Sequence, residues 1–422
     1  MKILFAVSVF DIGGAEVLAL RLAQQLHERG HEIMVFAANE KLFNKQLAAK
    51  YSPYIKSVYS LADWPVVRFV ASKLNALLRR LGFGDALILK VKSHFLRFVI
   101  KSEKVDLICS HSPRSDKVCA EAVKKLSVPF ITVEHGIYSH YLHIGKKQLL
   151  QPLRAATEII AVSDFCEKQI RSYVGTSAAI TTIYNGVIID PPHSRLQVRK
   201  ELGIGDGDIA FGLAARGVPQ KGWQAAIDAF LKLKTATRKG VHLILVGGSD
   251  YVDTLKETYK IHTDIHFIGK VANPAHYIDA VDVGLMLSMY RTEALSLIAI
   301  EFLMLGKPVI ATNVGGVPEV IQTGAGSSCQ LIDLDKTGAI DTEELTTAML
   351  SFTKGEKSLA LGAAPVEAIH KKFSMEACAG AYETFFRRVI ARNRKDHTPS
   401  AQGGQKASAV KQKVPQAEAV YS

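Results

Sequence analysis

The sequence has few cysteines, no apolar run long enough to cross a membrane, and no motif typical of a zinc site. Its five cysteines are scattered along 422 residues, with no CxxC pair and no His/Cys ligand spacing. An odd, dispersed set is typical of reduced thiols in a cytosolic protein, so neither disulfides nor zinc are expected. Without an apolar segment of about 18 residues, we expect a soluble protein or one bound peripherally to a membrane.

The apolar segment from Met1 to Phe10 could be a short signal peptide or a buried first strand. Gly13 and Gly14 follow with no small-residue cleavage site, which favours the strand. These glycines precede a helical pattern, where they would let the backbone approach a ligand closely. The spacing is not GxGxxG, so a nicotinamide cofactor is disfavoured, and a plain tight turn is the alternative.

The chain is basic, with a formal net charge of +12. Residues 66–104 carry nine Lys or Arg against Asp85 and Glu103, interleaved with Val, Leu, Ile and Phe. This mixture suits a helix lying on an anionic membrane surface. The alternative is one or two amphipathic helices with a solvated basic face. Nucleic acid is disfavoured because no zinc-finger or RNP motif accompanies the charge.

Short apolar runs alternate with helical patterns, which predicts βαβ units and parallel sheets. The pattern forms two series, so we expect two doubly wound α/β domains with a hinge near residues 185–202 and a ligand in the cleft between them. Residues 374–391 predict a final helix, and the polar residues 393–422 predict a disordered tail. The expected strands are 3–9, 32–37, 107–109, 130–133, 159–162, 209–213, 242–246, 266–268, 283–287 and 308–311.

Two glutamates, Glu293 and Glu301, flank the start of an apolar helix expected over residues 297–305. Such a helix start offers unpaired N–H groups and a positive dipole end to a phosphate. The two carboxylates could therefore grip the hydroxyls of a sugar or ribose attached to that phosphate. The spacing alone is a weak signal, and its context strengthens it.

Three more candidates follow strands. Arg216 and Lys221 lie in a Gly/Pro loop after the strand 209–213, where two cations could clamp a diphosphate, although an ordinary basic loop is the alternative. His135 follows the strand 130–133 and could hydrogen-bond a sugar hydroxyl, or could be a plain surface histidine. Glu134 is a second candidate, but neighbours on a strand point to opposite sides, so only one should face the ligand.

A metal site is not expected. Asp333 and Asp335 form the only acidic pair of the DxD kind near a strand end, and we interpret it as a solvated turn. The two cations and the helix start must then neutralise the diphosphate without Mg²⁺.

Nine motifs in order resemble family 4 of the retaining glycosyltransferases. The resemblance covers about residues 1–390. It implies the GT-B architecture: two Rossmann-like domains (1–187 and 188–373) facing a central cleft, with a C-terminal helix, about 374–392, crossing back to the first domain. The motifs are Gly13-Gly14-Ala15-Glu16, Glu134-His135-Gly136, Ala161-Val162-Ser163, Asn185-Gly186-Val187, Arg216 with Lys221-Gly222, Val246-Gly247-Gly248, Glu293 with Glu301, Gly306–Ala311, and Gly315–Glu319.

The resemblance also implies roles for particular residues. Arg216 and Lys221 would hold the donor diphosphate, Glu301 the nucleotide ribose and Glu293 the donor sugar. His135 would bind the sugar near the reacting centre. The backbone of Ala294, Leu295 and Ser296 would cap the distal phosphate, and the turn at Gly13 and Gly14 would leave room for it from the opposite domain. Departures from the family pattern, Ala294-Leu295-Ser296 and Phe302, leave the donor sugar open.

We therefore expect a glycosyltransferase that is cytoplasmic or bound peripherally at the inner face of the cytoplasmic membrane, and that uses a UDP- or GDP-sugar and no other cofactor. Its acceptor would be an envelope glycan precursor or a lipid-linked glycan, as in lipopolysaccharide or surface polysaccharide synthesis. The rivals are a nucleotide-sugar epimerase of the same fold and a non-catalytic protein that binds sugar nucleotides.

Overall fold

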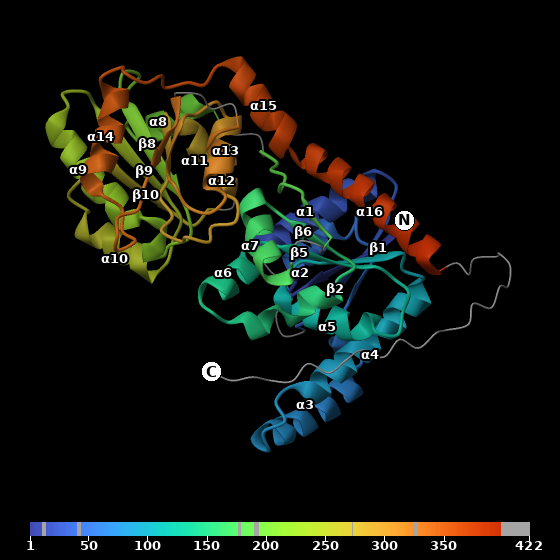
Figure 1. Cartoon of the computed structure of the whole chain (residues 1–422). Helices are drawn as coiled ribbons and strands as arrows, with labels where there is room; N and C mark the ends of the chain where they lie inside the picture. Colours follow the sequence, from blue (N-terminus) through green and yellow to red (C-terminus); the bar gives the residue numbers. More distant parts are fainter. Residues whose placement is uncertain are drawn as a thin grey trace, which may run out of the picture.

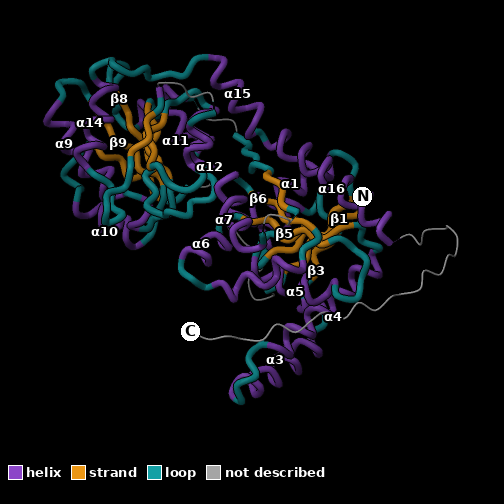
Figure 2. The backbone as a smooth tube through the Cα atoms, viewed as in Figure 1, coloured by secondary structure: helices purple, strands orange, loops and turns teal. Residues whose placement is uncertain are grey.

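The structure is a computed structural model that describes residues 1–10, 14–39, 44–175, 179–189, 194–271, 273–323 and 328–397. Its strands form two separate sheets, each covered by helices on both faces (Figures 1 and 2). All pairings between named strands are parallel, which confirms the expected α/β class with two doubly wound domains.

The first sheet has seven strands in the order β3-β2-β1-β4-β5-β6-β7. Its central strands are buried on both faces, which explains why they read as continuous apolar runs. The first of them, β1, confirms that the N-terminal apolar segment is a buried strand. The strands are β1 (Lys2–Val7), β2 (Glu32–Ala37), β3 (Ser57–Tyr59), β4 (Leu107–Ser110), β5 (Phe130–Glu134), β6 (Glu158–Ala161) and β7 (Ile180–Thr182).

Helices flank this sheet, and one pair projects from it. In Figure 1, α3 and the adjoining part of α4 extend beyond the rest of the first domain. Among the described residues, no helix is both long and apolar enough to cross a membrane. The helices are α1 (Gly14–Glu28), α2 (Lys45–Tyr51), α3 (Pro65–Arg80), α4 (Ala86–Glu103), α5 (Pro113–Val123), α6 (Ile137–His143) and α7 (Asp164–Val174).

The second sheet has six strands in the order β10-β9-β8-β11-β12-β13. The edge strands β3, β7 and β13 have only three residues each, too few for an apolar pattern to reveal them in the sequence. The strands are β8 (Ile209–Ala214), β9 (Val241–Val246), β10 (Ile265–Gly269), β11 (Val283–Met286), β12 (Val309–Thr312) and β13 (Gln330–Ile332). The helices are α8 (Arg195–Glu201), α9 (Trp223–Ala236), α10 (Asp250–Thr258), α11 (Ala275–Ala280), α12 (Leu297–Met304), α13 (Val317–Ile321), α14 (Thr342–Thr353) and α15 (Ala363–Phe373).

The last helix, α16 (Met375–His397), returns to the first domain and packs along α1 (Figure 1). The crossover passes Gly186, where a Cβ would lie 2.5 Å from the Cα of Met375, so only glycine fits there. Beyond it, Arg388 and Arg392 each bind the buried carboxylate of Glu158 at 2.8 Å. The predicted crossing helix is therefore present.

The prediction that the helix ends near 391 is wrong, because α16 continues to His397. Asn393 donates to the Ser127 carbonyl at 2.6 Å, and Arg394 pairs with Asp106 at 3.0 Å. These contacts to the first domain hold the last turns in place, and a polar composition alone does not reveal them. Residues 398–422 of the predicted tail lie outside the described part of the chain.

Candidate active site

The strand order of the second sheet reverses between β8 and β11. Ligands of doubly wound proteins bind at such a reversal, outside the carboxyl ends of the strands. A cavity of about 700 Å³ lies there and includes His135 from the other domain. It is lined by His135, Leu213, Ala214, Ala215, Arg216, Lys221, Leu285, Met286, Leu287, Ser288, Glu293, Leu295, Ser296, Leu297 and Ile298.

Lys221 and Glu293 form an ion pair inside this cavity, with Lys221 Nζ 2.6 Å from Glu293 Oε2. The Ser288 hydroxyl donates to the same Oε2 at 2.5 Å and accepts from Lys221 Nζ at 3.3 Å. Lys221 also lies over the Tyr290 ring, 5.3 Å from its centroid. The charge of Lys221 is thus balanced and its position held before any ligand arrives, while Ser288 orients the carboxylate of Glu293.

The loop from Glu293 to Ser296 precedes α12, and Glu293, Leu295 and Ser296 line the cavity. Among the described residues, the N–H groups of Ala294, Leu295 and Ser296 have no hydrogen-bond partner. The Ser296 side chain caps α12 by accepting from Ala299 N. Free N–H groups beside a helix start can bind an anion, so the phosphate cap by these three residues stays a prediction.

The Gly315-Gly316 turn supports this loop from behind. A Cβ on Gly315 would lie 2.0 Å from the Glu293 carbonyl, and one on Gly316 would lie 2.2 Å from the Ala294 carbonyl. The Gly316 N–H donates to the Glu293 carbonyl at 2.9 Å. The glycines are therefore required for this close approach, which sets where Glu293 and the N–H groups point.

His135 reaches the cavity from the carboxyl end of β5 in the first domain. Its Nε2 lies 3.1 Å from Nδ1 of His111, and the two rings stack. Burial lowers the pKa of His135 to about 4 and holds the pKa of His111 well below its ordinary value. Both imidazoles are therefore neutral at pH 7, so His135 can hydrogen-bond a ligand but brings no positive charge.

Glu134, the alternative to His135, points the other way. It is buried and accepts the N–H groups of Tyr138 at 3.0 Å and Ser139 at 2.7 Å, so it caps α6. Burial raises its pKa. The alternation along β5 thus decides between the two neighbours, as the sequence argument required.

A second buried carboxyl, Asp116, lies in α5 near this helix. Its Oδ2 accepts from the hydroxyls of Thr132 at 2.7 Å and Tyr138 at 2.6 Å. Burial raises the pKa of Asp116 to about 7. This group ties α5, β5 and α6 together behind the His135 loop.

The structure places the remaining predicted residues in different surroundings. Arg216 is exposed at the cavity mouth and makes no ion pair with a described residue. Glu301 is half-buried on α12, one turn beyond Leu297 on the same helix face, and the cavity lining ends before it. Gly14 is the first residue of α1, and Gly13 lies outside the described residues.

The two domains touch directly beside the cavity. Gly136 has φ +94°, and a Cβ there would lie 2.8 Å from the Cβ of Ala294 in the other domain. Glu319 of α13 accepts the N–H groups of Asp164 at 2.9 Å and Phe165 at 2.7 Å at the start of α7, and the Tyr184 hydroxyl at 3.0 Å. These contacts hold the domains in a closed arrangement.

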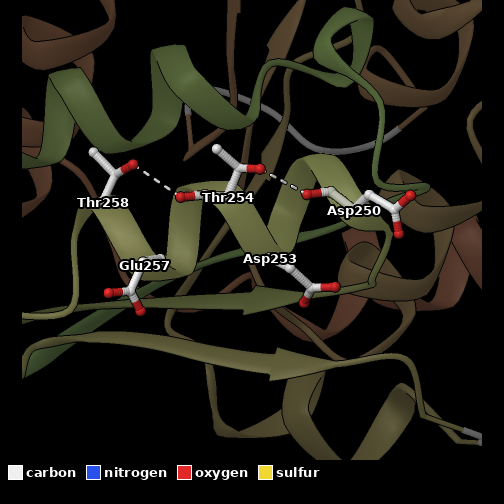
Figure 3. A pocket seen from close by; sticks show the side chains of 5 residues that line it. All are labelled: Asp250, Asp253, Thr254, Glu257 and Thr258. Carbon is white, nitrogen blue, oxygen red and sulfur yellow. Dashed lines mark hydrogen bonds between the residues drawn. The ribbon is translucent and has the colours of Figure 1, made fainter.

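Another recess, of about 540 Å³, runs along α10 (Figure 3). Its lining comes from one helix and includes three carboxylates, of Asp250, Asp253 and Glu257. The Thr254 and Thr258 hydroxyls are turned back to carbonyls of their own helix. Because carboxylates repel phosphate, this recess suits no diphosphate. Among the described residues, no three His, Cys, Asp or Glu side chains are grouped as metal ligands.

Two facing doubly wound domains with a cavity between them, and a C-terminal helix that crosses back to the first domain, define the GT-B class of glycosyltransferases. The model named Glycosyltransferase Family 4 matches residues 12–190, and the model named Glycosyl transferases group 1 matches residues 194–332. The chain belongs to family 4 of the GT-B glycosyltransferases and is a glycosyltransferase.

Curated relatives and solved structures of glycosyltransferases are similar to this chain over most of its length. It is similar to N-acetyl-alpha-D-glucosaminyl L-malate synthase of Bacillus anthracis, with 26% identity over 419 residues, 92% of this chain and 98% of the relative. A GDP-mannose-dependent alpha-(1-6)-phosphatidylinositol monomannoside mannosyltransferase of Mycobacterium tuberculosis is 27% identical over 263 residues, 57% of this chain and 64% of the relative. HepE of Anabaena, solved with UDP-glucose, has a TM-score of 0.68 and 21% identity, covering 94% of this chain and 100% of that one.

Sequence reasoning missed two residues of the site, Ser288 and His111. Both follow the carboxyl end of a strand, β11 and β4, as His135 follows β5. His135 was identified because it is a polar residue just after a strand. The same search at the end of every strand would have found Ser288 and His111. Their partners, Glu293 and His135, could not have been paired with them without the fold.

Proposed function

We propose that the protein is a retaining glycosyltransferase that moves a hexose or N-acetylhexosamine from a nucleotide-diphosphate sugar to an envelope glycan or lipid-linked acceptor. The observation that carries this proposal is the Lys221–Glu293 pair beside three free N–H groups, facing His135 across the domain boundary. Relatives named as GDP-mannose-dependent, and neighbours solved with UDP and UDP-glucose, support a UDP- or GDP-sugar donor.

Different residues would bind the diphosphate, the sugar and the ribose of the donor. The Lys221 ammonium, the Arg216 guanidinium and the N–H groups of Ala294, Leu295 and Ser296 would take up the charge of the departing diphosphate. Glu293 and neutral His135 would hold the sugar through its hydroxyls. Glu301 would bind the ribose hydroxyls further along α12.

In the transfer, the oxygen of the acceptor hydroxyl bonds to the anomeric carbon on the face that the phosphate leaves. The bond from that carbon to the phosphate oxygen breaks, and the same phosphate oxygen takes the acceptor proton. Configuration is retained without a carboxylate nucleophile. The catalytic contribution of the protein is positioning together with charge stabilisation. Because the protein itself supplies positive charge, we expect transfer to continue in EDTA.

The acceptor proposal rests on named relatives and neighbours that act on lipids or surface glycans. They include phosphatidylinositol monomannoside mannosyltransferases and a lipopolysaccharide outer core galactosyltransferase. A cytoplasmic enzyme at the inner face of the membrane would meet both a soluble donor and a lipid-linked acceptor.

A ligand screen tests the donor. Thermal unfolding is followed with UDP, GDP and ADP, and the base that raises the midpoint identifies the donor class, because a ligand of the folded state stabilises it. The matching radiolabelled sugar is then offered with lipid-linked glycans, and the anomeric configuration of the product is read by NMR. Inversion of configuration would contradict the retaining mechanism.

Two controls separate the rival functions. Donor incubated without acceptor should return unchanged, and an epimerised sugar would favour the epimerase. Glu293→Gln and Lys221→Met should each lower transfer at least about a hundredfold while the protein stays folded. If both variants kept the cellular phenotype of the wild type, a non-catalytic binding role would replace our proposal.

A further inference from the structure

Helix α3 exposes an apolar stripe that the described residues leave uncovered. Val66, Val70, Leu74, Leu77 and Leu81 recur every three or four residues and so lie along one helix face. Their exposed fractions run from 46% to 75%. Phe69 at the edge of the stripe and Phe83 in the following loop are also exposed, at 63% and 66%. A contiguous stripe of this size marks an interaction surface.

The neighbouring helix α4 is different, although the sequence joins both helices in one basic, apolar stretch. Its residues Phe95, Leu96, Val99 and Ile100 are buried in the core of the first domain. Two of its cations serve the fold: Lys92 donates to the Ala38 carbonyl and Arg97 to the carbonyls of Glu121 and Ala122. Phe98 is the one large apolar side chain of α4 counted as exposed among the described residues, at 55%, so the candidate surface of residues 66–104 lies mainly on α3 and its loop.

The opposite face of α3 is anchored to α4. Buried Asn75 donates to Asp85 at 2.9 Å and accepts the N–H of Ile88 at 3.0 Å, and Asp85 also pairs with Arg79. Ala71 is buried at the same contact. The stripe thus lies away from this anchored face, and α3 lies at the projecting end of the domain (Figure 1).

Charge decides which partner fits. Helix α3 carries Arg68, Lys73, Arg79 and Arg80 and no acidic residue. A second copy would bring a helix of the same charge against it, whereas anionic lipid headgroups complement the cations while acyl chains receive the stripe. We propose that α3 and its loop insert into the anionic leaflet of a membrane, with Val66, Val70, Leu74, Leu77, Leu81 and Phe83 entering the apolar region. This rests on the proposed lipid-linked acceptor and names the surface that brings the enzyme to it.

The test uses the full chain and co-sedimentation with phosphatidylcholine vesicles, with and without phosphatidylglycerol. We expect wild-type protein to sediment with the anionic vesicles and to be released by salt. The double variant Leu74→Asp/Leu77→Asp should lower the vesicle partition coefficient at least about tenfold, because two inserted side chains become charged. Both positions are exposed, so its melting temperature should not change. Ile261→Asp, at a residue of the second domain that is 78% exposed, is the matched control and should bind as the wild type does.

Each outcome has one meaning. Equal binding by the double variant and the wild type, or no binding by the wild type, overturns the proposal. A wild-type dimer in light scattering that the double variant loses would assign the stripe to a second copy and also overturns it. If vesicle binding fails while UDP or GDP still raises the melting temperature, the membrane inference falls and the donor proposal stands. If no nucleotide raises the melting temperature but the protein still binds vesicles, the donor proposal falls and the membrane inference stands.

Discussion

Glu319 offers the most direct test of how the two domains close over the site. Its carboxylate accepts two N–H groups at the start of α7 and the hydroxyl of Tyr184, all from the first domain, while Glu319 itself belongs to the second. Burial, with a smaller contribution from the carboxylates of Glu319 and Asp164, raises the pKa of Tyr184, so its hydroxyl stays a donor.

The expected magnitude follows from these contacts. A hydrogen bond to a charged group contributes about 1.5–3 kcal/mol net, and a carboxylate at a helix N-terminus adds about 0.3–1 kcal/mol. When the domains separate, hydrogen bonds to water replace part of this interaction free energy. We therefore expect Glu319→Ala to weaken the closed arrangement by about 2–4 kcal/mol, or about thirty- to a thousandfold in the closing equilibrium.

Small-angle scattering measures the closing equilibrium through the radius of gyration, which should increase in Glu319→Ala. The apparent affinity for nucleotide should fall in proportion to the lost closed population. Glu343→Ala is the matched control, because Glu343 also lies in the first turn of a helix but contacts only its own domain. If Glu319→Ala matches this control in both measurements, the contacts contribute nothing to closure and our reasoning is wrong.

Three further predictions concern the site and its support. Lys221→Ala should lower kcat about a hundred- to a thousandfold, as measured by product formation, because a donor to the leaving group is lost; unchanged kcat would remove Lys221 from the reaction. Gly136→Ala should lower the free energy of unfolding by more than Gly145→Ala does, as measured by urea titration. Both glycines have a positive φ, where a side chain costs about 1–3 kcal/mol, but only Gly136 also contacts Ala294 of the other domain. Equal losses would show that the domains do not touch there. The raised pKa of Asp116, from 3.8 to about 7, corresponds to about 4 kcal/mol. The folded protein keeps a proton that the unfolded chain releases, so wild-type stability relative to Asp116→Asn should fall as pH rises from about 4 to about 7, and a flat difference between these proteins would contradict the buried carboxyl.

The sequence determined the fold class and most of the candidate site. Buried parallel strands appear as apolar runs, and polar residues at their ends, such as His135 and Lys221, mark the edge where a ligand binds. The loop between Glu293 and the apolar helix α12 was equally readable, because a helix start has the same unpaired N–H groups in any fold. Local periodicity and helix chemistry suffice for these features.

Only the tertiary structure decided which residues meet. Lys221 and Glu293 are 72 positions apart and pair directly, and Ser288 hydrogen-bonds to both. His135 contacts His111, which follows a neighbouring strand of the first sheet. Glu319 joins the two domains, although the sequence predicts only a tight turn at residues 315–319. The stretch 66–104 shows the limit most clearly: one composition yields α4, whose apolar face is largely buried in the core, and α3, whose apolar stripe is exposed. Burial depends on what packs against a helix, and that neighbour is distant in the sequence.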